Sequence, residues 1–172
     1  MALPAPLPPP GRITVRIDPG LAFGTGSHAS TRLILGFLEK TIRGGERVLD
    51  YGCGSGILAI AAAKLGAAHV DAVDLDPEAL ETTRANAHAN AVEVHAAPPD
   101  ALSAADYDVV VANILAQPLI VLAPLLAQRA KRLALSGILE SQAEEVARAY
   151  RPKLDMTIAD RDEGWVLLAG QR

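Results

Sequence analysis

Apolar runs alternate with amphipathic stretches along most of this chain, in the order that an α/β protein requires. Strands are predicted at 48–51 and 69–74, and each is followed by a helical stretch, at 57–65 and 76–90. The run 107–112 is almost entirely apolar, as expected of a strand that is buried on both faces of a parallel sheet. This alternation predicts a doubly wound, mostly parallel sheet.

Further elements complete the expected α/β fold. Helices are also predicted at 29–40, 118–129 and 141–150, and strands at 12–18, 92–96, 132–135, 154–159 and 165–169. Only the short connection 160–164 separates the last two strands, so they should pair antiparallel as a hairpin at the edge of the sheet.

The most informative segment is 48–58, where a strand runs into Gly52, Gly54 and Gly56 before a helix begins. Glycine lets the main chain turn sharply and lets a ligand approach it closely. The helix start offers unpaired N–H groups to an acceptor. About 20 residues further on, the next strand ends at Asp74, whose carboxylate can accept hydrogen bonds from ribose hydroxyls. The pattern predicts a site for a nucleoside-containing cofactor.

The glycine spacing distinguishes between cofactors. The dinucleotide fingerprint is Gly-x-Gly-x-x-Gly, in which the third glycine leaves room for a pyrophosphate. Here the third glycine comes one residue early, and Ile57 occupies the position that the fingerprint gives to glycine. With Asp50 leading the turn, the motif resembles the first motif of class I S-adenosylmethionine-dependent methyltransferases. A glycine-rich turn without a ligand is the alternative interpretation.

Composition narrows the function classes. The 172 residues, 50% of them hydrophobic, suit a single α/β unit, and a net charge of −4 without a basic run argues against direct nucleic-acid binding. The single cysteine, Cys53, excludes an internal disulfide and a cysteine zinc cluster, and the histidines lack ligand spacing, so we expect no metal site. No signal peptide or membrane-length apolar run is visible, so we expect no membrane partner and a cytoplasmic location.

The first residues form a separate segment. Proline occupies positions 4, 6, 8, 9 and 10, which makes this segment stiff and unable to join a helix. We therefore expect 1–11 to be a linker and 12–172 to form the folded domain.

A second candidate position is Asn113, which directly follows the strand 107–112. In open α/β sheets, ligands bind outside the carboxyl ends of the strands, where the strand order switches. Asn113 is therefore expected to face the same crevice as Gly52 and Asp74. Its alternative role is to cap the segment that follows it.

Four segments together resemble one family: 18–28, 50–60, 112–115 and 135–139. The family is the bacterial methyltransferase that modifies protein eleven of the large ribosomal subunit. The resemblance implies a seven-stranded, Rossmann-like methyltransferase sheet. It also implies transfer of methyl groups from S-adenosyl-L-methionine to the N-terminal α-amine and lysine side chains of a free ribosomal protein, with S-adenosyl-L-homocysteine as product.

The same resemblance bears on domain organisation. The family has a separate N-terminal domain that recognises the ribosomal protein, joined by a linker, and this chain begins at the linker. We therefore expect a catalytic domain without its recognition domain, monomeric and with reduced activity on the ribosomal protein.

The resemblance also assigns site residues. Thr31, Gly52, Asp74 and Asn113 contact the cofactor by resemblance, and Asp50, Gly54 and Gly56 of the glycine motif are assigned to the same site. The loop that bears Phe23 and His28 closes over the cofactor, and both residues are candidates for catalysis. His28 is either a base near the pocket or an exposed residue at a helix start that Ser27 caps.

Methyl transfer to an amine requires a neutral nitrogen held in line with the methyl carbon. A strong base is not required, because the sulfonium charge and a partly dry pocket lower the pKa of the amine. Acceptors that orient the lone pair suffice, and we expect the Asn113 side-chain oxygen and the Ile114 carbonyl to supply them. Ile114 and Leu115 stand where methyltransferases acting on planar nitrogens have Pro-Pro-aromatic, which favours an aliphatic amine.

Three other functions remain open from sequence alone. A methyltransferase acting on a nucleic acid, or on another small or protein amine, would share the fold and the cofactor, although the acidic charge and 3% aromatic content argue against the nucleic acid. A nucleotide-dependent oxidoreductase would need the later third glycine and a substrate domain. The third alternative is a fragment that only binds the cofactor.

Overall fold

A computed structural model describes residues 12–18, 26, 28–102 and 105–172. Within them, the strands form one sheet in the order β3-β2-β1-β4-β5-β7-β6. The strands are β1 (Arg47–Tyr51), β2 (His69–Val73), β3 (His95–Ala97), β4 (Tyr107–Asn113), β5 (Ala130–Leu139), β6 (Thr157–Asp162) and β7 (Trp165–Gln171).

The strand pairing is parallel on one side of the sheet and antiparallel at the other edge. Strand β1 pairs in parallel with β2 and β4, β2 with β3, and β4 with β5. Strand β7 then returns antiparallel between β5 and β6, so the last two strands form an edge hairpin. The predicted fold, a doubly wound, mostly parallel seven-stranded sheet with an antiparallel edge hairpin, is confirmed.

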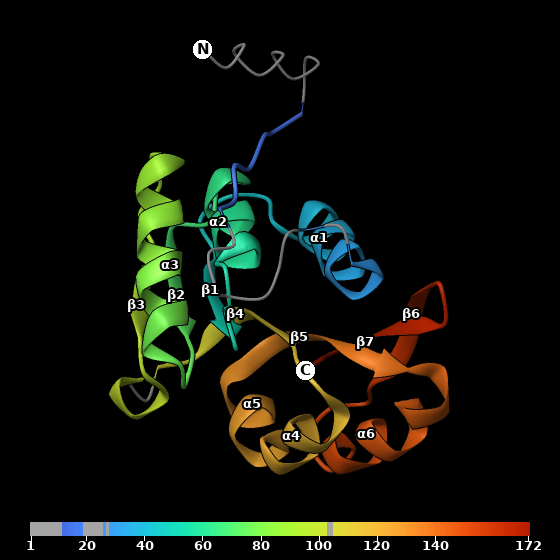
Figure 1. Cartoon of the computed structure of the whole chain (residues 1–172). Coiled ribbons are helices and arrows are strands. Elements are labelled where there is room, and N and C mark those ends of the chain that lie inside the picture. Colours follow the sequence, from blue (N-terminus) through green and yellow to red (C-terminus); the bar gives the residue numbers. More distant parts are fainter. Residues whose placement is uncertain (1–11, 19–25, 27, 103–104) are drawn as a thin grey trace.

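Helices cover both faces of the sheet (Figure 1). They are α1 (Ala29–Thr41), α2 (Ile57–Lys64), α3 (Pro77–Ala89), α4 (Ala116–Val121), α5 (Ala123–Arg129) and α6 (Ala143–Tyr150), with short 3-10 turns at Pro99–Ala101 and Glu140–Gln142. Strand β4 shows why the sheet needs both layers. Val109 and Val111 pack with α1, α2 and α3, whereas Val110 and Ala112 pack with α4, α5 and α6. A strand between two apolar layers must itself be continuously apolar.

Some predicted boundaries are wrong for identifiable reasons. The helix predicted at 118–129 is two helices, because Pro124 lies in the first turn of α5 and its ring would clash with a carbonyl of a continuous helix. The strand predicted at 92–96 begins only at His95, since Ala91 has a φ of 55° in the turn after α3. Strand β5 extends beyond the predicted 132–135 on both sides.

The strand predicted at 12–18 is also wrong, although its alternating pattern has a structural basis. Val15 and Ile17 pack against the core under α1, α2 and α3, while their neighbours are exposed. The segment is extended but does not join the sheet. Its main-chain groups at Arg16 and Asp18 bond instead to the side chains of Asn90, the C-cap residue of α3, and Asn86 on α3. Alternation predicts an extended chain without identifying its hydrogen-bonding partner.

Candidate cofactor and methyl-transfer site

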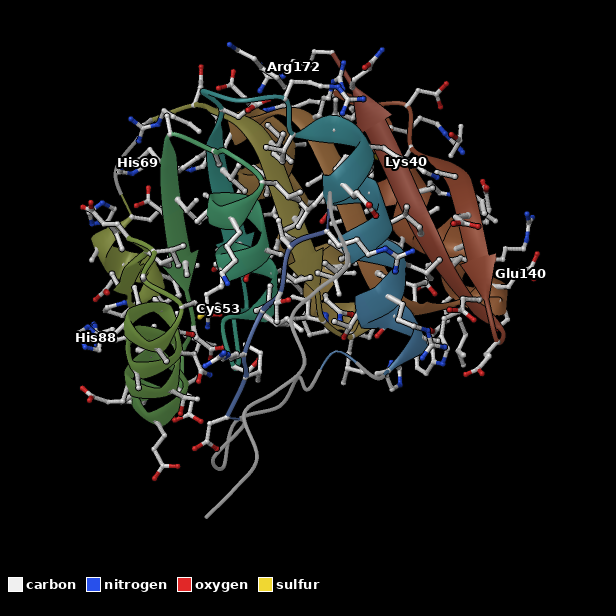
Figure 2. The ribbon with its side chains drawn as sticks, turned by 90° about the horizontal axis from the view of Figure 1, so that it is seen from above. Lys40, Cys53, His69, His88, Glu140 and Arg172 are labelled. Carbon is white, nitrogen blue, oxygen red and sulfur yellow. The ribbon has the colours of Figure 1, made fainter. Side chains whose placement is uncertain are left out.

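A cleft of about 970 Å³ lies at the carboxyl ends of β1, β2 and β4. Its lining includes Tyr51 to Gly54 at the end of β1, Asp74 and Leu75 after β2, and Asn113 to Leu115 at the end of β4. Figure 2 labels Cys53 at this end of the sheet and His69, the first residue of β2, at the opposite end. The structure thus brings the glycine turn, the acidic strand end and Asn113 together, as the sequence predicts.

The glycine turn is tied to the end of β2. The N–H groups of Gly52 and Cys53 both donate to the carbonyl oxygen of Val73, at 2.8 and 3.0 Å. Gly52 has a φ of +82°, and a Cβ on it would lie only 2.6 Å from a methyl carbon of Ile114. Glycine is therefore required at this position both by the backbone conformation and by the close approach of the chain after β4.

The carboxylate of Asp74 is held in place by two main-chain donors. Its Oδ2 accepts a hydrogen bond from the Gly54 N–H at 3.0 Å, and its Oδ1 accepts one from the Asp76 N–H at 2.9 Å. Each carboxylate oxygen can accept more than one hydrogen bond, so further acceptor capacity remains on the cleft wall. The arrangement fixes this carboxylate against the glycine turn.

Asp50 and Gly56, which the sequence assigns to the cofactor site, lie behind the cleft wall rather than among the residues that line it. Asp50 is fully buried, and its Oδ2 accepts a hydrogen bond from the Ala59 N–H in the first turn of α2, at 3.2 Å. Its Oδ1 is buried without a hydrogen-bond partner among the described residues. Burial, opposed by the Ala59 hydrogen bond and reinforced by the charge of Asp74, raises the pKa of Asp50 to about 7.

Asn113 is oriented by the first helix. Its Nδ2 donates to the Oγ1 of Thr31 at 3.2 Å, and the buried Thr31 lines the cleft beside it. With the amide nitrogen engaged in this way, the Oδ1 of Asn113 remains as the acceptor of the side chain. Thr31 and Asn113 therefore act as one unit on this wall.

Gly137 supports the same wall from β5, a contribution that sequence reasoning missed. It lies where the register between β5 and β7 shifts, and its φ is +84°. A Cβ at this position would overlap the carbonyl oxygen of Ile114 and lie 3.1 Å from Asn113 Oδ1. The bulge therefore lets β5 approach the Asn113–Ile114 main chain closely. The positive φ required at Gly137 depends on this tertiary contact, which the local sequence does not reveal.

His28 is the N-cap residue of α1, so the expectation that Ser27 caps this helix is wrong. The His28 Nδ1 accepts a hydrogen bond from the Ser30 N–H at 3.1 Å and lies 2.6 Å from the Ser30 Oγ. In a neutral ring the proton must then reside on Nε2. The ring packs edge-on against Trp165, with centroids 4.9 Å apart. Phe23, the other candidate from this loop, lies outside the described residues.

The rim of the cleft carries exposed apolar side chains that sequence reasoning also missed. Leu75, Leu115 and Val121 line the cleft and are 87%, 70% and 76% exposed. An apolar residue in a predicted helix is normally expected in the core, so the sequence alone gave no signal for Val121.

Charged groups are scarce in the cleft. Among its described lining residues, Asp74 supplies the only carboxylate, and no lysine or arginine is present. Residues 19–25 and 27 contain no acidic or basic side chain in the sequence. A substrate amine near Asn113 would therefore meet neutral polar groups and apolar surface.

Two other observations limit the chemistry of the described residues. They contain no group of three or more histidine, cysteine, aspartate or glutamate side chains able to hold a metal ion, and no helix long and apolar enough to cross a membrane. The Cys53 Sγ accepts a hydrogen bond from Thr83 Oγ1 at 3.3 Å, and burial raises the pKa of the thiol to about 12. Cys53 is therefore a packing residue of the turn rather than a nucleophile.

Solved structures show that this is a Rossmann-like methyltransferase fold. The 16S rRNA N2 G1207 methyltransferase of T. thermophilus, solved with AdoMet and guanosine, matches with a TM-score of 0.72 and 23% identity, over 88% of this chain and 45% of that one. A ribosomal protein L11 methylase from Lactobacillus delbrueckii subsp. bulgaricus matches with a TM-score of 0.83 and 35% identity, over 92% of this chain and 84% of that chain.

The chain belongs to the ribosomal protein L11 methyltransferase family, since the family model "Ribosomal protein L11 methyltransferase (PrmA)" matches residues 5–172. The family expected from the sequence is thus confirmed. A ribosomal protein L11 methyltransferase of Cupriavidus necator is 54% identical over 168 residues, covering 96% of this chain and 56% of the relative. That of Thiobacillus denitrificans is 56% identical over 161 residues, with 92% and 54% covered. The chain thus spans little more than half the length of these curated relatives.

Proposed function

We propose that this chain transfers methyl groups from S-adenosyl-L-methionine to amino groups of ribosomal protein L11, namely its N-terminal α-amine and lysine side chains. One observation carries the proposal. In a chain of this family, Asp74, whose carboxylate is fixed, and Asn113 and Ile114 line one cleft at the ends of β2 and β4, the two strands that flank β1. The carboxylate suits a nucleoside, and the acceptors at Asn113 and Ile114 suit an amine.

The cleft fits the proposed cofactor. Its volume of about 970 Å³ lies within the ~300–1,000 Å³ range of small-molecule sites. Asp74 would accept the ribose hydroxyl hydrogens, because its carboxylate is already fixed by Gly54 and Asp76. Gly52 and Gly54 would present their main chain to the cofactor, and Thr31 and Asn113 line the same cleft. Asp50 and Gly56 would support the turn from behind. When bound, the cofactor supplies a methyl group on a positively charged sulfur.

The acceptor wall would hold the substrate amine. The Asn113 Oδ1 and the Ile114 carbonyl oxygen would each accept a hydrogen from the nitrogen, which directs its lone pair away from them and toward the cofactor side of the cleft. Thr31 fixes the orientation of the Asn113 amide, and Gly137 allows the Ile114 main chain to occupy its position. In this proposal, Asn113 and Ile114 are the catalytic residues, and Thr31 and Gly137 are positioning residues.

The scarcity of charged groups on this wall bears on the protonation state of the substrate amine. Among the described lining residues, Asp74 already accepts the Gly54 and Asp76 N–H groups and His28 Nδ1 accepts that of Ser30, so we expect the amine to lose its proton before transfer. At pH 7 this costs about 4.6 kcal/mol for a lysine side chain with a pKa near 10.4, but only about 1–1.4 kcal/mol for an N-terminal α-amine with a pKa near 7.7–8.0. An apolar cleft lowers both costs, because burial disfavours the charged ammonium.

We further propose that residues 12–172 form the methyltransferase domain, that 1–11 act as a linker, and that the domain works as a monomer. Recognition of L11 would depend mainly on parts of the enzyme outside this domain. Methyl transfer to L11 by this chain alone is therefore expected to be slow, with a high KM for the protein substrate.

The proposal is tested by calorimetric titration of S-adenosyl-L-methionine, followed by transfer of its labelled methyl group to purified L11. We expect binding that weakens by more than about tenfold in Asp74→Ala, the scale of about 1.4 kcal/mol for a hydrogen bond to a charged group. Asp100→Ala, an exposed carboxylate outside the cleft, is the matched control. Binding without label on L11 would exclude the proposed substrate, and the absence of binding by folded protein would exclude the proposed cofactor.

A further inference from the structure

Two asparagines, Asn86 on α3 and Asn90 at its C-cap, hold the extended segment 12–18 by its main chain. The side chain of Asn90 accepts from the Arg16 N–H at 2.9 Å and donates to the Arg16 carbonyl at 2.7 Å. Asn86 does the same for Asp18, accepting at 3.1 Å and donating at 2.9 Å. Each amide side chain thus replaces the main-chain partner that a neighbouring strand would offer.

The geometry of the two elements explains why this pairing works. Arg16 and Asp18 are two residues apart in an extended chain, a rise of about 6.6 Å, and Asn86 and Asn90 are four residues apart in a helix, a rise of about 6.0 Å. The two repeats nearly match, so both pairs form together. The Lys64 ammonium of α2 also donates to the Thr14 carbonyl. In both figures, segment 12–18, drawn in the darker blue, runs beside α2.

Asn86 has a further contact that Asn90 lacks. Its Nδ2 also donates to the carbonyl oxygen of Ser55, at 2.8 Å, inside the glycine turn. Asn86 is 3% exposed, and its amide nitrogen lies between two carbonyl oxygens while its oxygen faces an N–H, so its orientation is unambiguous. This one side chain therefore ties segment 12–18 to the turn that precedes α2.

From these contacts we propose that Asn86 is a positioning residue that couples docking of segment 12–18 to cofactor binding at the glycine turn. The inference rests on the proposed function, because it takes the turn as the cofactor site. Ser55 lies between Gly54, whose N–H is bonded to Asp74, and Gly56, which caps α2. Fixing the Ser55 carbonyl therefore restrains the peptide units that would face the cofactor.

Coupling of this kind is reciprocal. If a docked segment stabilises the cofactor-binding form of the turn, a bound cofactor must stabilise docking of the segment by the same factor. The Arg16 and Asp18 amides report docking directly, because each donates its hydrogen to one of the two asparagines. The Gly44 amide is a matched reference, since it also donates to a side chain, that of Glu46, but lies at the opposite end of β1 from the glycine turn.

The experiment combines hydrogen exchange by NMR with calorimetry, using S-adenosyl-L-homocysteine as the probe. We expect saturation with the probe to slow exchange at Arg16 and Asp18 by at least about fivefold, the lower end of typical coupling factors, with Gly44 unchanged. We expect Asn86→Ala to weaken probe affinity by a similar factor of about five and to abolish the protection. Asn90→Ala removes the Arg16 contact but leaves Asp18 bonded to Asn86 and Asn86 bonded to Ser55, so it should release the Arg16 amide while keeping protection at Asp18 and affinity within about twofold.

Other outcomes overturn the coupling or its premise. Equal affinity losses in both variants would indicate general weakening of α3, and unchanged exchange at Arg16 and Asp18 in wild type saturated with the probe would exclude coupling. Because the exchange measurement needs no substitution, it decides the matter even if Asn86→Ala does not fold. Wild-type protein that is folded but does not bind the probe would instead refute the proposed function, and the coupling with it.

Discussion

The carbonyl oxygen of Ile114 lies against the α-carbon of Gly137, so closely that a side chain on Gly137 would overlap it. This contact joins β5 to the chain segment that follows β4, on the wall where the amine is proposed to bind. The position of the Ile114 carbonyl is therefore set by a residue more than twenty positions away in the sequence.

Gly137→Ala is expected to displace this wall. The added methyl group must push the Ile114 carbonyl away, so methyl transfer should fall by roughly 10- to 100-fold, since misplacing a reacting group by about an ångström can cost about 100-fold. The affinity for S-adenosyl-L-homocysteine should change less. Steady-state kinetics and calorimetry check both. Gly164→Ala is the matched control, because Gly164 has nearly the same φ, +83°, with nothing near its would-be Cβ.

Thr31→Val removes the acceptor for the Asn113 amide while keeping the shape of the side chain. The Asn113 Nδ2 is then left without this partner, at a cost of about 1–3 kcal/mol if the group stays buried, and the amide is free to rotate. We expect a kcat reduced roughly tenfold, with the melting temperature lowered only slightly. Thr41→Val, at the far end of α1, should leave kcat unchanged. Equal kcat values in both variants would show that Thr31 does not orient Asn113.

His28→Asn distinguishes a helix cap from a general base. Asparagine is a good N-cap residue, so stability should be retained, whereas His28→Ala should lose about 0.5–2 kcal/mol of unfolding free energy. Because Nδ1 already accepts the Ser30 N–H, we expect His28→Asn to keep the shape of the pH–rate profile. Loss of the acidic limb of the profile in this variant would show that His28 acts as a base.

The raised pKa of Asp50 makes the free energy of unfolding decrease as pH rises. Its pKa is raised from 3.8 to about 7 in the folded chain, so between these values the folded state keeps a proton that the unfolded state releases. Unfolding free energy should therefore fall as pH rises through this window, by about 1.4 kcal/mol per unit, and level off above it. Asp50→Asn should lack this decline. Urea unfolding at pH 5 and pH 8 measures the difference, and parallel behaviour of the two proteins would refute the raised pKa.

The rates on two amines should depend on pH differently. If the amine must arrive neutral, transfer to a lysine peptide should rise about tenfold per pH unit up to near pH 10, and transfer to an N-terminal α-amine should level off near pH 8. The kcat/KM values for two peptides, each with a single free amine, test this. A common plateau for both peptides would indicate an enzyme base that titrates independently of the substrate.

Much of the site could be predicted because its chemistry is encoded locally. Gly52, Asp74 and Asn113 each stand at the end of a strand with its own apolar signature, and parallel strands bring their carboxyl ends to one edge. The edge hairpin follows equally from a short connection between two strands. The break between α4 and α5 could also have been predicted, since Pro124 marks it in the sequence.

The remaining features depend on contacts between distant parts of the chain. The sequence gives no sign that Gly137 must meet Ile114, that Trp165 packs against His28, or that Asp50 turns beneath α2 instead of into the cleft. The segment 12–18 has a strand-like pattern, and only the folded structure shows that asparagine side chains, not a strand, satisfy its main chain.

The binding of segment 12–18 by two asparagine side chains has a consequence for sequence variation. Because Asn90 binds only main-chain atoms of Arg16, the side chain at this position can change while the path of the chain is kept. Proline is the exception, since it lacks the N–H that each asparagine oxygen accepts. Substitutions at 16 should thus be tolerated broadly, whereas the two asparagines should resist replacement.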